Sequence, residues 1–285
     1  MITKLEISLD VPFRAAPWLT TSQLMKTHGG VVEFATDRPN VLVGPNGAGK
    51  SALIETIALR FLAFLEGRSR FDLNYMRSNE ARAWWTEGKG WYGKPHFLEG
   101  LSVEADAGLV RYYRPNHIPG NDDSVAAAMM CGYFEQARHY AKLTEDKSSG
   151  QKAQALQEEI LGMLEGRGLP VPLCIPERWP QPGDLDSITI PDLYERQKAV
   201  LVDMMFGAAT QASDAARPLI LLDEPEQSLD ALKEAQLWRA IAQADCTQCQ
   251  VIVASHSLYP LMHPDQFNLI EAVPGYIKDV FALVR

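Results

Sequence analysis

The sequence predicts an α/β fold with a mostly parallel central sheet. A strand over residues 31–43 leads into the glycine-rich segment GPNGAGKS at residues 44–51, and apolar residues recur at helical spacing over residues 50–66. Two further runs, PLILLDE at residues 218–224 and QVIVASH at residues 250–256, read as strands buried on both faces of a parallel sheet. We also expect antiparallel β elements near the N-terminus and a helical second lobe.

The remaining strands are expected in two places. Residues 2–13 alternate between apolar and polar side chains, as a strand does. Residues 101–115, LSVEADAGLVRYYRP, resemble a hairpin that turns near residues 106–108.

The expected helices cover residues 124–143, about 152–165, about 191–212 and 228–243. Prolines between residues 170 and 182 indicate a surface loop. We therefore expect one domain, with a first lobe formed by residues 1–66 and 214–285 and a second lobe, with insertions, formed by residues 67–213.

Composition narrows the class of protein. The chain has 285 residues, of which 46% are hydrophobic, so it can bury a sizeable core. Lys plus Arg number 27 against 36 Asp plus Glu, a net charge of −9, so a nucleic-acid contact would need a local basic patch. We expect no membrane span and no secretory signal, and four cysteines do not suggest a disulfide scaffold. These features favour a cytoplasmic protein.

The segment GPNGAGKS has the composition of a phosphate-binding loop. Its three glycines let backbone N–H groups close around phosphate oxygens. Lys50 would neutralise the β and γ oxygens, and Ser51 would ligate Mg²⁺. We therefore predict a nucleotide-binding loop made of Gly44, Pro45, Asn46, Gly47, Ala48, Gly49, Lys50, Ser51 and Ala52.

Two adjacent carboxylates end the apolar run PLILLDE. Asp223 is suited to hold Mg²⁺, directly or through water, and Glu224 is suited to polarise an attacking water as general base. Carboxylates this close repel each other, and a nearby cation would relieve that cost.

The ordered segments resemble the ATP-binding-cassette (ABC) superfamily of P-loop ATPases. GPNGAGKS, LILLDEP, SLD and ASH follow one another as that family's Walker A loop, Walker B strand, D-loop and switch histidine do. The resemblance implies an enzyme that binds ATP and Mg²⁺ and hydrolyses ATP, with Lys50, Glu224 and His256 as catalytic residues. It further implies that His256 contacts the γ-phosphate, and that Asp230 lies at the seam of a homodimer that sandwiches ATP.

Two stretches compete for the family's signature loop, which meets the partner protomer's nucleotide. SSGQ matches the Ser-x-Gly-Gln core and precedes a helix whose N-terminus can face an anion, but it lies about 70 residues before LILLDEP. YERQ at residues 194–197 has the better spacing but carries Tyr194 in place of glycine. A third alternative is that neither is the signature. The SSGQ residues that would bind nucleotide are Ser148, Ser149, Gly150 and Gln151.

The branch of the family is indicated by spacing and by LDEPEQSLD. The layout is similar to the chromosome-maintenance (SMC), recombination and repair group, and the acidic residue after Glu-Pro is similar to ATPases of bacterial anti-phage defence. One departure is the absence of the Gln that usually follows the first helix, since Gln136 is the only Gln between Ser51 and SSGQ and lies too late for that role. Asn79 or Glu80 replaces that contact, or it is missing. Alternative functions are a transporter's motor subunit and a non-hydrolysing nucleotide switch.

Residues 60–97 interleave basic and aromatic side chains. Seven Lys and Arg stand against four Asp and Glu, and seven aromatic side chains lie among them from Phe71 to Phe97. Such a stretch suits DNA or RNA, a protein partner, or a small core with a solvated rim. We expect the ATPase to act through a separate protein effector, since a dimer that opens and closes needs something to read its state.

Overall fold

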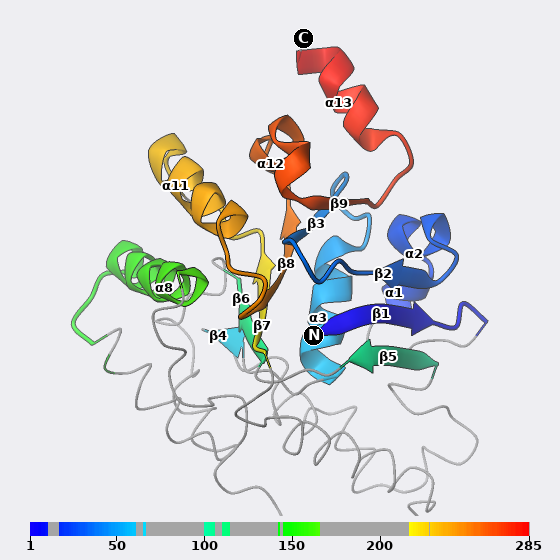
Figure 1. Ribbon diagram of the computed structural model, residues 1–285, viewed down its shortest axis with the longest axis horizontal. Helices are drawn as coiled ribbons and strands as arrows, with labels where there is room; N and C mark the ends of the chain where they lie inside the picture. Colours follow the sequence, from blue (N-terminus) through cyan, green and yellow to red (C-terminus); the bar gives the residue numbers. More distant parts are fainter. Residues whose placement is uncertain are drawn as a thin grey trace, which may run out of the picture.

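The computed structural model describes residues 1–10, 17–60, 65–66, 100–105, 110–114, 142, 145–165, 217–227 and 229–284. These residues form a mixed α/β structure with one parallel and one antiparallel sheet (Figure 1). The α/β class predicted from the sequence is therefore confirmed.

The parallel sheet is the centre of the structure. Each neighbouring pair of its strands runs parallel, and β3, β7 and β8 are buried along their whole length. Because both faces are covered, the central residues of these strands form continuous apolar runs rather than an alternating pattern, and the polar residues stand at the strand ends. In order across the sheet, the strands are β4 (Leu65–Glu66), β6 (Val110–Tyr113), β7 (Leu219–Asp223), β8 (Gln250–Ser255), β3 (Asn40–Val43) and β9 (Asn268–Glu271).

The antiparallel sheet has β1 (Ile2–Ile7) between β2 (Val31–Glu33) and β5 (Leu101–Ala105). The side chain of Gln250 links it to the parallel sheet. The buried amide of Gln250, on β8, accepts from the backbone N–H of Ile2 at 2.6 Å and donates to the backbone oxygen of Ile2 at 2.7 Å.

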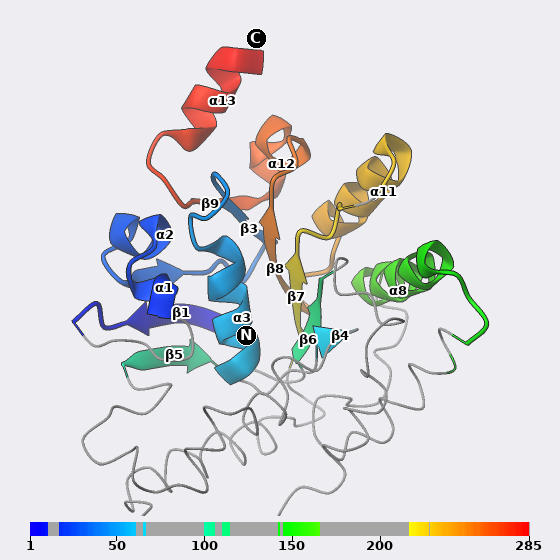
Figure 2. The same ribbon diagram turned by 180° about the vertical axis from the view of Figure 1, so that it is seen from behind.

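Helices cover the two faces of the parallel sheet. Helix α3 (Lys50–Arg60) packs on one face, against β6, β7 and β8. Helices α8 (Ser149–Leu164) and α11 (Ala231–Ala242) lie on the opposite face (Figures 1 and 2). The other described helices are α1 (Pro17–Thr20), α2 (Gln23–Thr27), α12 (Tyr259–Met262), the 3₁₀ turn η2 (Pro264–Gln266) and α13 (Tyr276–Val284).

The larger apolar core lies between the sheet and α11. Trp238 of α11 is fully buried there, with Tyr259 stacked at a ring-centroid distance of 6.2 Å and Phe267 edge-on at 5.7 Å. Alternate residues of β7 and β8, such as Leu222 and Val253, face this cluster. A rigid core on this side fixes the strand ends at the carboxyl edge of the sheet.

The strand predicted over residues 31–43 is two strands in different sheets. Asp37, Arg38 and Pro39 turn the chain between β2 and β3, and proline cannot donate to a ladder. The buried Asn40 side chain closes this turn, since it accepts from the N–H of Ala35 at 2.7 Å and donates to the Ala35 oxygen at 2.9 Å.

Two other predictions differ from the structure, one in strand pairing and one in the end of a helix. The segment over residues 101–115 is not a hairpin, because β5 pairs with β1 and β6 pairs with β7. The helix over residues 50–66 is described as far as Arg60, and residues 65–66 form β4 beside β6. In the N-terminal stretch, the strand ends at Ile7.

The helices predicted at about residues 152–165 and 228–243 are present as α8 and α11. The helices predicted at 124–143 and 191–212, the proline loop at 170–182 and most of the aromatic stretch at 60–97 lie outside the described residues. The division into two lobes stays a prediction for the same reason.

Candidate functional site

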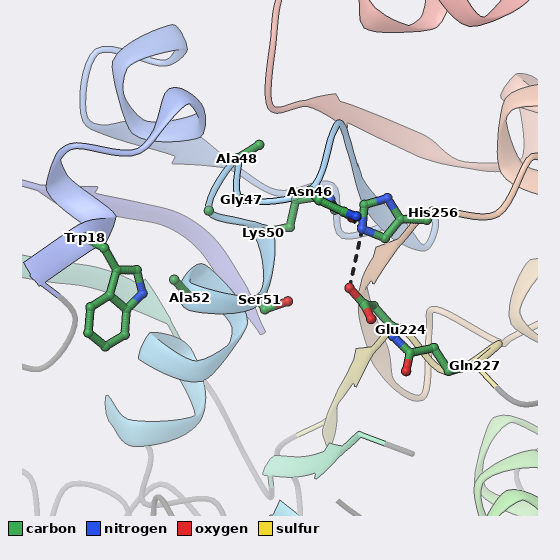
Figure 3. Close-up of a pocket in the computed structure, with 11 residues that line it drawn as sticks. Trp18, Asn46, Gly47, Ala48, Lys50, Ser51, Ala52, Glu224, Gln227 and His256 are labelled. Carbon is green, nitrogen blue, oxygen red and sulfur yellow. Dashed lines mark hydrogen bonds and ion pairs between the residues drawn. The ribbon is translucent and has the colours of Figure 1, made fainter. Parts of the chain in front are cut away.

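A pocket of about 700 Å³ opens at the carboxyl edge of the parallel sheet. It lies where β3, β7 and β8 end, because parallel strands bring the residues that follow them to one edge. Figure 3 shows Trp18 at one side and Glu224 and His256 at the other, with the predicted loop between them. The lining residues are Trp18, Asn46, Gly47, Ala48, Gly49, Lys50, Ser51, Ala52, Glu224, Gln227 and His256.

The segment from Gly44 to Ser51, here called the glycine loop, contains three glycines with positive φ angles, and Gly47 and Gly49 lie furthest from extended backbone. Gly47 has φ +74° and Gly49 has φ +106°, a region that side chains disfavour. A Cβ on Gly49 would also lie 2.6 Å from the Cβ of Ser22, which is inside contact distance. These glycines let β3 turn directly into α3 and bring the loop backbone to the pocket wall.

Lys50, the first residue of α3, reaches back across the glycine loop. Its Nζ donates to the backbone oxygens of Gly44 at 2.8 Å and Pro45 at 3.1 Å. Burial lowers the pKa of this ammonium, and the carboxylates of Glu224 and Asp223 oppose that shift. The pocket therefore holds a cation whose position is fixed by the loop itself.

Ser51 and Asp223 form an oxygen pair beside Lys50. The Ser51 hydroxyl donates to Asp223 Oδ1 at 2.8 Å, and the Asp223 side chain is fully buried. Burial raises the pKa of Asp223, and Arg114 and the Ser51 hydroxyl oppose that shift. Hydroxyl and carboxylate oxygens are the ligands that Mg²⁺ prefers, usually one or two from protein with the rest from phosphate and water. Within the described ranges, no group of three or more His, Cys, Asp or Glu side chains could hold a metal.

The sequence reasoning missed the cation that balances Asp223. Arg114, just after β6, places Nε 3.2 Å from Asp223 Oδ2 and a terminal nitrogen 2.9 Å from Glu55 Oε1. The Tyr112 hydroxyl adds a longer bond of 3.4 Å to Asp223 Oδ2. A cation was expected beside the carboxylate pair, but a lone Arg after an apolar strand carries no signal of its distant partner.

Glu224 and His256 meet across the pocket from different strand ends. Glu224 adopts a left-handed backbone with φ +50°, a conformation that is rare outside glycine and costs conformational free energy. Its Oε1 lies 3.4 Å from His256 Nε2, and the same nitrogen lies 3.1 Å from Lys50 Nζ (Figure 3). Because one nitrogen faces both groups, a neutral imidazole satisfies one contact at a time.

Two other pocket residues have no sequence signal. Trp18 of α1 is 52% exposed and presents its indole at the rim of the pocket. Gln227 lies in the turn after Glu224, and its backbone N–H donates to the Glu224 oxygen at 3.1 Å.

Asp230 and SSGQ lie away from this pocket. Asp230 is exposed and caps α11 by accepting from the N–H groups of Leu232 and Lys233, both at 3.0 Å. Ser148 caps α8, and the Gln151 side chain completes a capping box. Asp230 was predicted to lie at the seam of a dimer, and SSGQ to meet the partner's nucleotide, and both roles stay predictions. The competing YERQ and the proposed replacements Asn79 and Glu80 lie outside the described residues.

No protein-family model and no curated protein sequence matches this chain.

The pKa of His256 offers a check on the arrangement of Lys50, Glu224 and His256. Burial lowers this pKa, the Lys50 charge lowers it further, and Glu224 raises it. We therefore expect Glu224→Gln to lower the His256 pKa further, because a carboxylate that raises this pKa is replaced by a neutral amide. The measurement is an NMR titration of the imidazole resonances in ligand-free protein. Glu33→Gln, on the antiparallel sheet, is the control. A pKa that rises or stays constant in Glu224→Gln contradicts the contact.

Proposed function

We propose that this protein is a P-loop ATPase of ABC type that binds ATP with Mg²⁺ and hydrolyses it. The observation that carries the proposal is the convergence of three separate segments on one pocket. Lys50 and Ser51 come from the glycine loop, Asp223 and Glu224 from the end of β7, and His256 from the end of β8. These are the segments whose order resembles the ABC family.

Binding of the triphosphate is supported by the charge and shape of the pocket. The ammonium of Lys50 sits at the inner end of the glycine loop, where loop and helix N–H groups also favour an anion. Trp18 presents an exposed ring at the opposite rim, and a ring of this kind can stack on a nucleotide base. A volume of about 700 Å³ lies in the range of pockets that hold small ligands.

Hydrolysis is assigned to Glu224 with His256. Glu224 accepts a proton from the attacking water, and the lowered pKa of His256 leaves its imidazole neutral, with one N–H that can donate to a phosphate oxygen. Ser51 and Asp223 would hold Mg²⁺, which neutralises charge on the phosphates when bound. Lys50 then exchanges its bonds to loop carbonyls for phosphate oxygens.

The wider role follows from the resemblance and is part of the proposal. The protein would form a homodimer around ATP with Asp230 and SSGQ at the seam, and would drive or license a separate effector in DNA repair or anti-phage defence. The aromatic stretch at residues 60–97 would contact that effector or nucleic acid, and the proposed setting is the cytoplasm. In the part of the chain that the structure describes, no helix is long and apolar enough to cross a membrane.

Phosphate release from ATP tests the proposal directly. We expect the purified chain to release phosphate from ATP in the presence of Mg²⁺. The rate should fall to background in excess EDTA, because the ATP phosphates then lose their counter-cation. ATP binding is measured in parallel by calorimetry. Binding without release in any condition supports the non-hydrolysing switch instead, and a lack of binding removes the proposal.

A further inference from the structure

Two carboxylates fix the loop that carries His256. Glu226 Oε1 accepts from the Ser255 hydroxyl at 2.6 Å and from the backbone N–H of His256 at 2.9 Å. Glu234, in the first turn of α11, accepts from the Ser257 hydroxyl at 2.6 Å. Both carboxylates come from the segment that follows β7, so this segment holds the loop that follows β8.

The loop is also bonded within itself. The Ser255 hydroxyl accepts from the N–H of Ser257 at 2.9 Å, and the Ser257 hydroxyl accepts from the N–H of Tyr259 at 3.1 Å. Each of the two hydroxyls therefore connects a carboxylate to the loop backbone. This arrangement leaves the His256 imidazole little freedom beyond its own side-chain rotation.

The sheet itself does not hold Glu224 and His256 together. The β7–β8 ladder ends at the pair Asp223 and Ala254, and one more bond, from the Glu224 N–H to the Ala254 oxygen at 2.8 Å, extends it. Beyond that point these two segments no longer pair with each other, and Ser255 pairs with Val43 of β3. The bonds that Glu226 accepts from the Ser255 hydroxyl and the His256 N–H are the next links between them.

We propose that Glu226 is a positioning residue for the hydrolysis step, which holds His256 where its Nε2 meets Lys50 and Glu224. Glu226 is not one of the residues that line the pocket, so it acts through its bond to the backbone of His256. The catalytic consequence rests on the proposed ATPase function, whereas the placement of His256 can be measured without ATP.

The environment of Glu226 shows which variant preserves this role. Both described bonds use Oε1, while Oε2 is buried and has no partner within the described part of the chain. Burial raises the pKa of Glu226, so a neutral side chain is tolerated there. Glutamine keeps an acceptor oxygen of the same reach. Glu226→Gln should therefore preserve the position of His256, and Glu226→Ala should not.

The test compares Glu226→Ala, Glu226→Gln and the unaltered chain. With the loop released, the imidazole of Glu226→Ala reaches solvent, so its pKa should rise towards the ordinary value of about 6.5 in an NMR titration of ligand-free protein. Phosphate release should fall about ten- to a hundredfold because reacting groups are misplaced, with ATP affinity within about twofold. Glu226→Gln should restore both readouts.

Glu271 supplies a matched control. Its carboxylate also holds a loop, by accepting from the N–H groups of Gly275 at 3.1 Å and Ile277 at 2.7 Å. Glu271→Ala should leave the His256 titration unchanged. Should Glu226→Ala not fold, Ser255→Ala removes the shared hydroxyl and should shift the titration in the same direction.

The His256 titration and the phosphate-release measurement test two different proposals, and each can be overturned without the other. An unchanged His256 titration in Glu226→Ala and Ser255→Ala overturns the positioning role, whatever the rate of phosphate release. A chain that releases no phosphate overturns the proposed ATPase, and the titration still decides whether Glu226 places His256.

Discussion

Glu224→Gln should lower the rate of phosphate release from ATP by at least about two orders of magnitude, a typical share for general-base catalysis. The amide keeps the size of the side chain and can still lie beside His256 Nε2, but it cannot take a proton from water. ATP affinity should stay within a few-fold, because the contacts assigned to the phosphates come from the glycine loop and Lys50. Steady-state phosphate release and calorimetry measure the two quantities.

The same variant should accumulate an ATP-dependent dimer, because ATP that is bound and not hydrolysed keeps the proposed seam closed. Light scattering with and without ATP measures the mass. Glu33→Gln, an exposed carboxylate on β2, controls for loss of one charge. Hydrolysis at the unaltered rate would remove Glu224 from the mechanism, and a monomer at saturating ATP would remove the sandwich dimer.

Arg114→Ala should lower the free energy of unfolding by about 3–5 kcal/mol, the usual cost of removing one partner of a buried ion pair. Two carboxylates lose their counter-charge at once. Asp223 is fully buried and the Glu55 side chain is 8% exposed, and Arg114 contacts them at 3.2 and 2.9 Å. Urea unfolding at neutral pH measures the loss. Arg38→Ala is the control. Arg38 also pairs with a carboxylate, that of Asp37 at 3.0 Å, but this pair lies on the surface. Surface ion pairs contribute about 0–1 kcal/mol to the free energy of unfolding.

The cost of Arg114→Ala should depend on pH in a defined direction. Burial raises the pKa of Asp223 in the folded protein, and loss of Arg114 raises it further. Folding then disfavours the ionised carboxylate, so the penalty is full above this raised pKa. It shrinks as pH falls towards the ordinary value of about 3.8, where the unfolded chain also takes up the proton. A loss that grows on acidification contradicts the assignment of the charge pair.

The sequence predicted the parts of the site that are encoded locally. The glycine loop, Asp223 at the end of β7 and His256 at the end of β8 each follow a continuous apolar run, and such runs identify buried strands without knowledge of their partners. Positive φ angles at Gly47 and Gly49 are equally local. These features explain why α/β class and pocket lining could be predicted together.

What the sequence could not predict is pairing between distant segments. Residues 101–105 and 110–113 are close in the chain and read as a hairpin, yet they pair with strands of different sheets. The edge strand β9 was missed because NLIE is short and only partly buried. Arg114 and Glu226 were missed as site residues because their roles depend on Asp223 and on the His256 backbone, across 109 and 30 positions of the chain.

The place of β3 between β8 and β9 has a consequence for synthesis on the ribosome. Both strands that neighbour β3 lie after residue 249 in the chain. Gln250, whose side chain is hydrogen-bonded to β1, lies 248 residues from its partner Ile2. A nascent chain that emerges from its N-terminus therefore exposes β3 before either of its neighbouring strands, β8 or β9, has been made. Contacts of such long sequence separation form slowly, since the intervening chain must first be ordered. The glycine loop can thus become rigid only after β8 and β9 have been made, and until then the apolar β3 needs protection from association with other chains.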